Sequence, residues 1–444
     1  MFFYNFDFFF LFKYAIFTLA LVYDFFFFLI FIFFVFIKII SLYKINGIFF
    51  FYYFYSFKKH SVIQYLLPLI SLLLSFFCYS ISLKKNKLNS RKSLIFYSIF
   101  NLIFFFFFFS KNILEFFVFY ECMLLISVFL VLFNSVNKRS SLTSIYFLFW
   151  TQMGSFLVFL GVIFLIKNFS FFSFNDLFNH NFKKNNFISI CSFFIFLGFG
   201  VKIPIWPFHF WITKVHVEAN TGFSIFLSGI LVKTAAFGLY KFFSLINLEL
   251  IKFFFILLVM SLIDVSFKLF NQNDFKKLIA YATIFEMNLS MLMLIFFSKN
   301  SLLLFFYLLV FHALLSGLFF FYSDMFYKFF NTRIVSSIKN LQQISFVVSL
   351  FFFSSILIFV GLPLTIKFFL EIHFLLKLVS YDFSITLLIL ITFMLFNVNF
   401  LKFFFHIFFS NFNKKFSNSI ALSSRDFVFL LFFNLLLLSM PMFF

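Results

Sequence analysis

The sequence predicts an all-α membrane protein that crosses the bilayer many times. Of its 444 residues, 64% are hydrophobic and only 11% are charged, and the mean hydropathy is +1.12. Apolar runs recur at lengths near the roughly 20 residues that a helix needs to span the hydrocarbon core. A transmembrane β-barrel would instead show short strands of alternating hydrophobicity, which the sequence lacks. We therefore expect a polytopic helical protein.

The apolar runs predict thirteen or fourteen transmembrane helices. The count has two values because the run 47–57 is short and ambiguous. The other expected spans are 8–37, 62–83, 93–109, 112–133, 142–166, 187–217, 222–245, 251–270, 277–297, 301–325, 344–378, 382–408 and 427–444.

Positive charge is concentrated between these runs. A net charge of +20 would suggest a nucleic-acid partner in a soluble protein. Here the basic residues form loop clusters such as Lys138-Arg139, Lys276-Lys277 and Lys414-Lys415, and loop charge of this kind orients a protein in the membrane. If the short run 47–57 spans the membrane, these loops all fall on one face, and we then expect that face to be the inner one, matrix or cytoplasm, with both termini on the other. We expect no nucleic acid bound.

The cysteines and the N-terminus predict little further chemistry. Cys78, Cys122 and Cys191 are isolated in or beside apolar runs, so we expect neither a disulfide framework nor a metal site. The chain opens directly into Phe-rich sequence without a basic region or a small-residue cleavage site, so we expect no removable signal or transit peptide.

Two of the runs are too long for one straight helix. The segments 187–217 and 344–378 would each reach roughly 45–50 Å, against a hydrocarbon core of about 30 Å. The first contains Pro204 and Pro207, and the second contains Gly361-Leu362-Pro363. Simple kinks would explain the prolines, but ionisable residues beside both breaks favour discontinuous helices. Such a pair in two halves of a chain is typical of inverted repeats around a central ion path.

Charged side chains inside these spans are the candidate functional residues. Lys202 and Lys233 lie inside apolar runs, where a lysine costs roughly 2.5–3.5 kcal/mol on insertion scales. Snorkelling to the interface is the alternative, but neither residue is close to the end of its run. Lysine suits a proton relay because desolvation can move its pKa towards neutrality. Asp264, near the end of a span, is expected at the interface.

Motifs at family spacing give a specific resemblance across residues 115–375. They include Val201-Lys202-Ile203-Pro204 with His209 and Trp211, His216-Val217-Glu218-Ala219, and Leu231-Val232-Lys233. Three further segments match the same family pattern. They are Tyr120-Glu121-Cys122-Met123, Asn271 to Tyr281, and Gly361-Leu362-Pro363 through Glu371. The chain resembles the subunit 4 family of mitochondrial NADH:ubiquinone oxidoreductase, respiratory complex I. That family belongs to the antiporter-like membrane subunits shared with multi-subunit cation/proton antiporters.

The resemblance implies a function and a fold. It implies a core membrane subunit of complex I in the mitochondrial inner membrane, translocating protons with energy from electron transfer from NADH to ubiquinone. This chain would carry no cofactor and no redox catalysis; NADH, FMN, iron–sulfur clusters and ubiquinone would belong to partner subunits. Its partners would be other membrane-arm subunits, especially antiporter-like neighbours, and lipids such as cardiolipin. The implied divisions are N-terminal helices 1–92, repeats 93–245 and 251–408, and a C-terminal loop and helix 409–444.

The resemblance also implies a proton relay near mid-membrane. Its expected members are Glu121, Lys202, Lys233, Glu286, His312 and Glu371. Glu121 and Lys202 match paired family positions, so we expect their charged atoms about 4–7 Å apart, close enough for strong coupling. A static ion pair is the alternative for these two residues, and a satisfied core histidine is the alternative for His312.

Three positions depart from the family pattern. Asn220 and Thr213 stand where the family has proline, and Glu286 stands where it usually has histidine. We expect Glu286 to face the protein interior near Lys233 or His312, because an unpaired carboxylate in hydrocarbon is costly. Two other functions stay open: a subunit of an Na⁺/H⁺ antiporter with the same fold, and a membrane scaffold that translocates nothing.

Overall fold

The computed structural model contains helices of membrane-spanning length throughout the part that it describes. Seven helices are long and apolar enough to cross a membrane, and four shorter apolar helices accompany them in this part of the chain. The predicted spans 8–37 and 47–57, and most of 62–83, lie outside the described residues. The described residues are 67–68, 70–75, 78, 87–133, 138–169, 173–179, 186–245, 248–296, 299–363, 365–409 and 424–439.

The helices follow the predicted apolar runs closely. In the first part of the chain they are α5 (Lys87–Phe109), α6 (Ile113–Phe133), α7 (Lys138–Phe169), α8 (Phe174–Asn179), α9 (Asn186–Lys202), α10 (Phe210–Glu218), α11 (Thr221–Phe226) and α12 (Val232–Phe242). They continue as α13 (Leu248–Phe270), α14 (Phe275–Ile295), α15 (Lys299–Phe330), α16 (Leu341–Ile344), α17 (Phe346–Val360), α18 (Ile366–Val379), α19 (Phe383–Phe409) and α20 (Ser424–Ser439).

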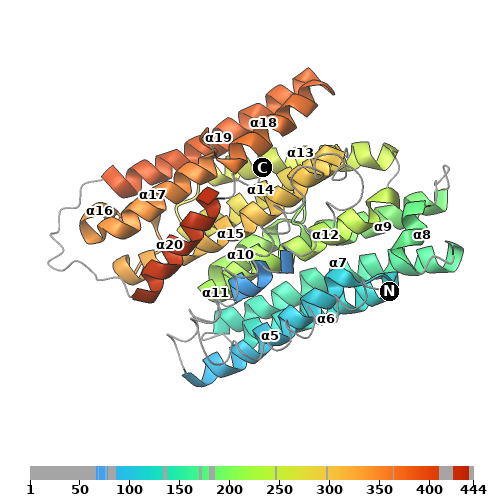
Figure 1. The fold of residues 1–444 in the computed structure, drawn as a ribbon, viewed down its shortest axis with the longest axis horizontal. Coiled ribbons are helices and arrows are strands. Elements are labelled where there is room, and N and C mark those ends of the chain that lie inside the picture. Colours follow the sequence, from blue (N-terminus) through green and yellow to red (C-terminus); the bar gives the residue numbers. More distant parts are fainter. Residues whose placement is uncertain are drawn as a thin grey trace, which may run out of the picture.

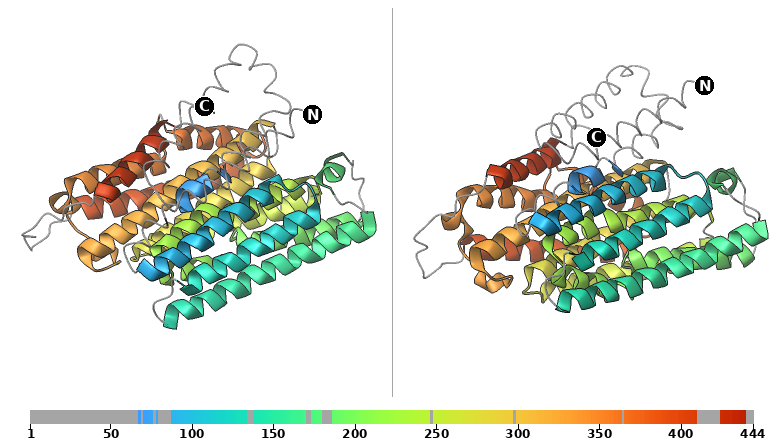
Figure 2. Two further views of the ribbon diagram at one scale, coloured as in Figure 1. Left: turned by 60° about the horizontal axis from the view of Figure 1, so that its bottom comes forward. Right: turned by 90° about the horizontal axis from the view of Figure 1, so that it is seen from below.

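Three spans form the centre of the molecule. The span Thr221–Leu245, which contains α11 and α12, is 100% buried, and the spans of α14 and α15 are 94% buried. In α6, α7, α13 and α19, by contrast, less than half of each span is buried. Figure 1 shows α5 to α7 along one side, α17 to α19 along the other, and the central helices between them. The views in Figure 2 show the long helices running side by side. Side chains on the central helices are therefore enclosed by protein.

Both predicted breaks are present. The first long run divides into α9 and α10, with non-helical backbone at residues 203–209. The second divides into α17 and α18, and the break begins at Gly361, whose φ of 78° is in the left-handed region that favours glycine. Each proline also removes a backbone donor, which disfavours an uninterrupted helix. The prediction of two discontinuous helices is confirmed.

The central span contains a feature that the sequence did not predict. Between α11 and α12 the helix passes through a π-helical turn at Leu227–Leu231, two residues before Lys233. Single π-turns within α-helices are rare and recur at functional sites. This turn rotates the following residues relative to a regular helix, and it therefore helps to set the direction of the Lys233 side chain.

Helices α7 and α9 approach closely at a pair of glycines. A Cβ atom added to Gly198 would lie 2.5 Å from the carbonyl oxygen of Gly154 and 2.7 Å from the backbone nitrogen of Val158. Backbone atoms cannot move aside as the end of a flexible side chain can. Small residues commonly allow such close contact between membrane helices. The crossing matters for the site because α9 ends at Lys202.

The first prediction concerns this crossing. Gly198→Ala is expected to destabilise the chain by about 1–3 kcal/mol through overpacking, measured as a lower melting temperature of the assembled membrane complex. Gly222→Ala is the matched control, because a Cβ atom there meets its nearest neighbour at an ordinary 3.4 Å. Equal melting temperatures for the two variants would contradict the close approach of α7 and α9.

Candidate functional site

Ionisable side chains occupy the interior of the helix bundle. Lys202, Lys233, Lys367, Glu286 and His312 are each no more than 3% exposed. They come from α9, α12, α18, α14 and α15, so the fold gathers them from five elements. A buried charge is expensive unless another group compensates it. Their partners therefore decide what this buried row of ionisable side chains can do.

Lys233 and His312 are in direct contact at the centre of the row. The Lys233 Nζ lies 2.7 Å from the His312 Nδ1, and it also donates a hydrogen bond to the backbone carbonyl of Ser228 in the π-helical turn. An ammonium group that donates to an imidazole nitrogen can transfer that proton, because both groups can be neutral or charged. Two members of the expected relay are thus in direct contact.

Glu286 lies in the protein interior, as expected, but its direct partner is a residue that the sequence analysis missed. Its Oε1 lies 2.5 Å from the Nζ of Lys367. Lys367 Nζ also donates to the carbonyl of Phe359 at 2.6 Å and lies 3.5 Å from the Oε1 of Glu371. Two carboxylates therefore share one ammonium group, and Glu286 is close enough to Lys233 to attract its charge.

Lys367 could have been recognised from its position relative to Glu371. The two residues are four apart, so they lie on one face of a helix at adjacent turns. The lysine also stands in the first turn of α18, directly after the Gly361 break. Glu371 is a member of the expected relay, and the structure joins it to Lys367.

The predicted partners Glu121 and Lys202 make no direct ion pair in the described structure. The Lys202 Nζ stands 4.0 Å from the centroid of the Tyr120 ring and has no hydrogen-bonding partner. Glu121 is half-buried and accepts a hydrogen bond of 3.3 Å from the Gln152 side chain. Its carboxylate still attracts the lysine charge across the gap. The predicted separation of 4–7 Å and the role of this pair stay predictions.

Side-chain hydrogen bonds to backbone carbonyls stabilise the first broken helix. Trp211 Nε1 donates to the Val201 carbonyl at 2.8 Å, which provides a partner for a backbone group beside the break. At the far end of α10, Lys276 Nζ donates to Ala219 O at 2.9 Å and an Arg333 guanidinium nitrogen donates to Val217 O at 2.8 Å. Cations suit these positions because the carbonyl end of a helix carries partial negative charge.

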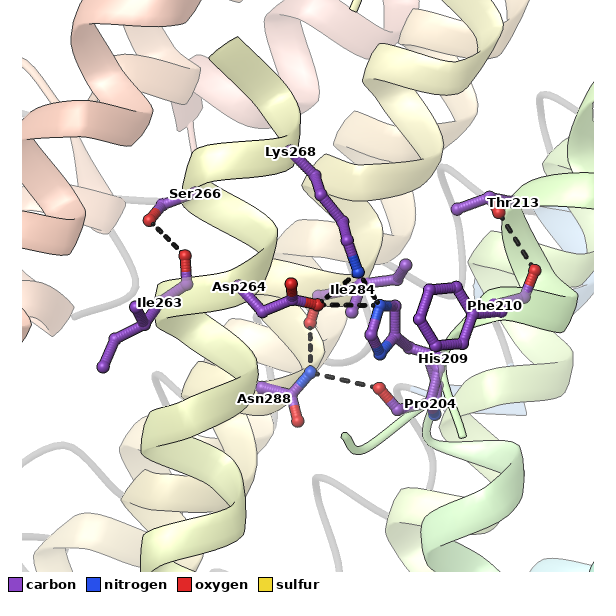
Figure 3. Close-up of polar contacts among 10 residues, drawn as sticks. All are labelled: Pro204, His209, Phe210, Thr213, Ile263, Asp264, Ser266, Lys268, Ile284 and Asn288. Carbon is purple, nitrogen blue, oxygen red and sulfur yellow. Dashed lines mark hydrogen bonds and ion pairs between the residues drawn. The ribbon is translucent and has the colours of Figure 1, made fainter. Parts of the chain in front are cut away.

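The histidines of this region contact other side chains. Among the described residues, no three His, Cys, Asp or Glu side chains are grouped so that they could hold a metal ion. His216 is stacked on Phe320 with ring centroids 4.6 Å apart. His209 contacts Asp264 and Lys268 of α13 instead, as Figure 3 shows.

Comparisons with known proteins match most of this chain. The profile of a family described as "NADH:quinone oxidoreductase/Mrp antiporter, TM" matches residues 110–397. NADH-ubiquinone oxidoreductase chain 4 of Paramecium tetraurelia is 37% identical over 317 residues, which cover 68% of this chain and 66% of that relative. The match thus spans slightly less than two thirds of the relative's length.

Solved structures show the same fold. A chain of the archaeal membrane-bound sulfane sulfur reductase is similar with a TM-score of 0.78 and 16% identity, covering 86% of this chain and 79% of that one. A chain of respiratory complex I from Thermus thermophilus with bound NADH has a TM-score of 0.72 and 21% identity, covering 84% of this chain and 81% of that one. At these identities the likeness concerns the fold alone.

Proposed function

Because the chain belongs to the NADH:quinone oxidoreductase/Mrp antiporter transmembrane family, we propose that it is a proton-translocating membrane subunit of respiratory complex I. The buried row carries this proposal. Four buried ionisable side chains meet on the enclosed central helices and on α18: Lys233, His312, Glu286 and Lys367. A structural role alone would not require so many groups that are costly to bury. The chain would act as part of an NADH:ubiquinone oxidoreductase and perform no redox step itself.

The contacts support a relay in which each charge controls the next. Lys233 can pass a proton to the His312 Nδ1, which it already faces at 2.7 Å. Glu286 attracts the Lys233 charge and is bonded to Lys367, so protonation of either partner changes the field at Lys233. At the other end, a change in the attraction between Glu121 and Lys202 would favour loss or gain of a proton by the lysine. Glu371 would be the terminal group.

The two broken helices support a division into two inverted repeats. We assign residues 93–245 and 251–408 to these repeats, with 1–92 and 409–444 outside them. Each proposed repeat contains one discontinuous helix, α9 with α10 and α17 with α18, and each break has a buried lysine next to it. The two broken segments would run through the membrane in opposite senses, as is common in transporters built from inverted repeats.

The remaining parts of the assembly would lie in other chains. Partner subunits would hold NADH, FMN, the iron–sulfur clusters and ubiquinone, and their electron transfer would drive proton movement here. Apolar side chains cover the outer faces of α7, α13 and α19. These faces suit lipids, including cardiolipin, and antiporter-like neighbours in the mitochondrial inner membrane. We assign no nucleic-acid partner.

The second prediction tests this function in the intact complex reconstituted into liposomes. Lys202→Gln is expected to lower NADH-driven proton translocation about a hundredfold, because a neutral amide cannot carry a proton through the row. NADH oxidation by an artificial electron acceptor should continue. Lys252→Gln is the control, since Lys252 is an exposed lysine on α13.

Each rival function has its own signature in the same experiment. Translocation that requires an Na⁺ gradient and ignores NADH would identify an Na⁺/H⁺ antiporter subunit, which the description of the family also covers. Unchanged NADH-driven translocation in Lys202→Gln and in Glu371→Gln would identify a scaffold. The mass-spectrometric composition of the complex, with or without flavin and iron–sulfur subunits, would support the same distinction.

A further inference from the structure

A second cluster of ionisable side chains lies apart from the buried row, where α13 passes the break between α9 and α10. Asp264 Oδ2 lies 3.0 Å from the His209 Nε2 and 2.5 Å from the Lys268 Nζ. Lys268 Nζ in turn lies 3.1 Å from the same histidine nitrogen. Figure 3 shows the three side chains converging from α13 and from the start of α10. Each of the three contacts the other two.

The cluster reaches from the surface into the interior. The Asp264 and Lys268 side chains are each 28% exposed, whereas the His209 side chain is 0% exposed. Asp264 and Lys268 lie in the last two turns of α13, which leads through residues 271–274 to Lys276-Lys277. That loop is on the face predicted to be the inner one. Asp264 and Lys268 are therefore partly exposed near that end of α13, whereas His209 is enclosed by protein.

Buried polar atoms on and beside the broken segment lack a hydrogen-bonding partner among the described residues. His209 Nδ1 is buried and makes no hydrogen bond, and the same is true of the Oδ1 of Asn288 on α14. Asn288 is tied to the broken segment, because its amide nitrogen donates to the Pro204 carbonyl at 3.3 Å (Figure 3). Lys202 Nζ, at the start of the same break, is also buried without a hydrogen-bonding partner. Leaving such atoms unsatisfied costs free energy, so each of them would stabilise water that enters the break.

We propose that Asp264, Lys268 and His209 form a proton-access site that connects the inner aqueous phase to Lys202. Asp264 or Lys268 takes up a proton and passes it to the His209 Nε2, which gives an imidazolium. The imidazolium then releases the proton on Nδ1 into the break, which leaves the neutral ring protonated on Nε2. A ring flip exchanges the places of the two nitrogens, so that an unprotonated nitrogen again faces Asp264 and Lys268. One proton enters and one leaves. This proposal rests on the proposed function, because it supplies protons to the row on which that function depends.

The alternative is an ion-pair network that only fastens α13 to the broken helix. The two roles differ in what a substitution changes. A fastening network would affect the stability of the complex and, through it, all activities equally. A proton-access site would slow proton delivery in a stable complex, so that proton transfer becomes rate-limiting and the solvent deuterium isotope effect rises.

The test uses the intact complex reconstituted into liposomes and compares Asp264→Asn with Glu249→Gln. Glu249 is an exposed carboxylate in the first turn of the same helix, which makes it a matched control. Asp264→Asn is expected to lower NADH-driven translocation about tenfold, a modest loss for a proton-transferring group, and to raise the isotope effect. Asp264→Glu should recover most of the rate, and the melting temperature of the complex should stay near the unmodified value.

The outcomes separate this proposal from the function on which it rests. If Lys202→Gln abolishes translocation while Asp264→Asn and His209→Gln leave the rate and the isotope effect unchanged, the access site is wrong and the relay stands. If Asp264→Asn slows translocation only in proportion to a lower melting temperature, the fastening network is correct. If none of these variants affects NADH-driven translocation, the proposed function itself fails.

Discussion

Replacing Lys367 with methionine is expected to destabilise the complex and to abolish proton translocation. The substitution removes the ammonium group that lies 2.5 Å from Glu286 and 3.5 Å from Glu371, and it leaves two carboxylates in an enclosed site. Breaking a buried pair by removing one partner typically costs about 3–5 kcal/mol. The measurements are the melting temperature of the purified complex and NADH-driven translocation after reconstitution.

A second substitution separates the structural effect from the functional one. In Lys367→Met/Glu286→Gln the uncompensated charge at Glu286 is gone, so most of the lost stability should return. Translocation should not return, because neither new side chain exchanges protons. Lys377→Met, which changes a partly exposed lysine on the same helix, controls for the loss of a positive charge from α18. Recovery of translocation in the double variant would contradict a functional role for this pair.

The sequence predicted the two broken helices because the physical cause of each is local. Pro204 and Gly361 act on their own backbone, and a run of more than 30 residues cannot cross the bilayer as one straight helix. The central position of Lys233 was also predictable, because its distance from the ends of its span is visible in the chain. In each case the informative residues lie within one segment.

The partners in the site were less predictable because they depend on tertiary packing. Lys367 and Glu286 are 81 residues apart in sequence, and only the packing of α18 near α14 brings them together. The π-helical turn beneath Lys233 carries no Pro or paired-Gly signal that would mark it in the sequence. The direct neighbour of Lys202 was likewise not predictable, since its Nζ faces the ring of Tyr120, the residue next to Glu121. Motif spacing placed these residues in the same region without fixing their contacts.

Asp264 shows a similar limit. The sequence analysis placed it at the interface because it lies near the end of a span, and it is indeed partly exposed. Its contact with His209 could not be predicted, because the histidine belongs to a different span and points to α13 only after the chain breaks at residues 203–209. A residue that appears interfacial in the sequence is thus in contact with a side chain that is fully buried.

The last prediction distinguishes a lysine that carries charge from one that exchanges protons. Lys233→Arg keeps the positive charge near His312, but a guanidinium does not deprotonate in proteins. If Lys233 only balances charge, translocation in Lys233→Arg should stay near the unmodified rate, whereas Lys233→Met should lose it. If Lys233 passes protons to the His312 Nδ1 at 2.7 Å, both variants should fall about a hundredfold or more. We expect the second result, measured as NADH-driven translocation in liposomes.

Lys241→Met is the control, because Lys241 is a buried lysine on the same helix whose Nζ donates to a backbone carbonyl, that of Ser110. Translocation in Lys233→Arg at the unmodified rate would overturn the assignment of Lys233 as a proton carrier.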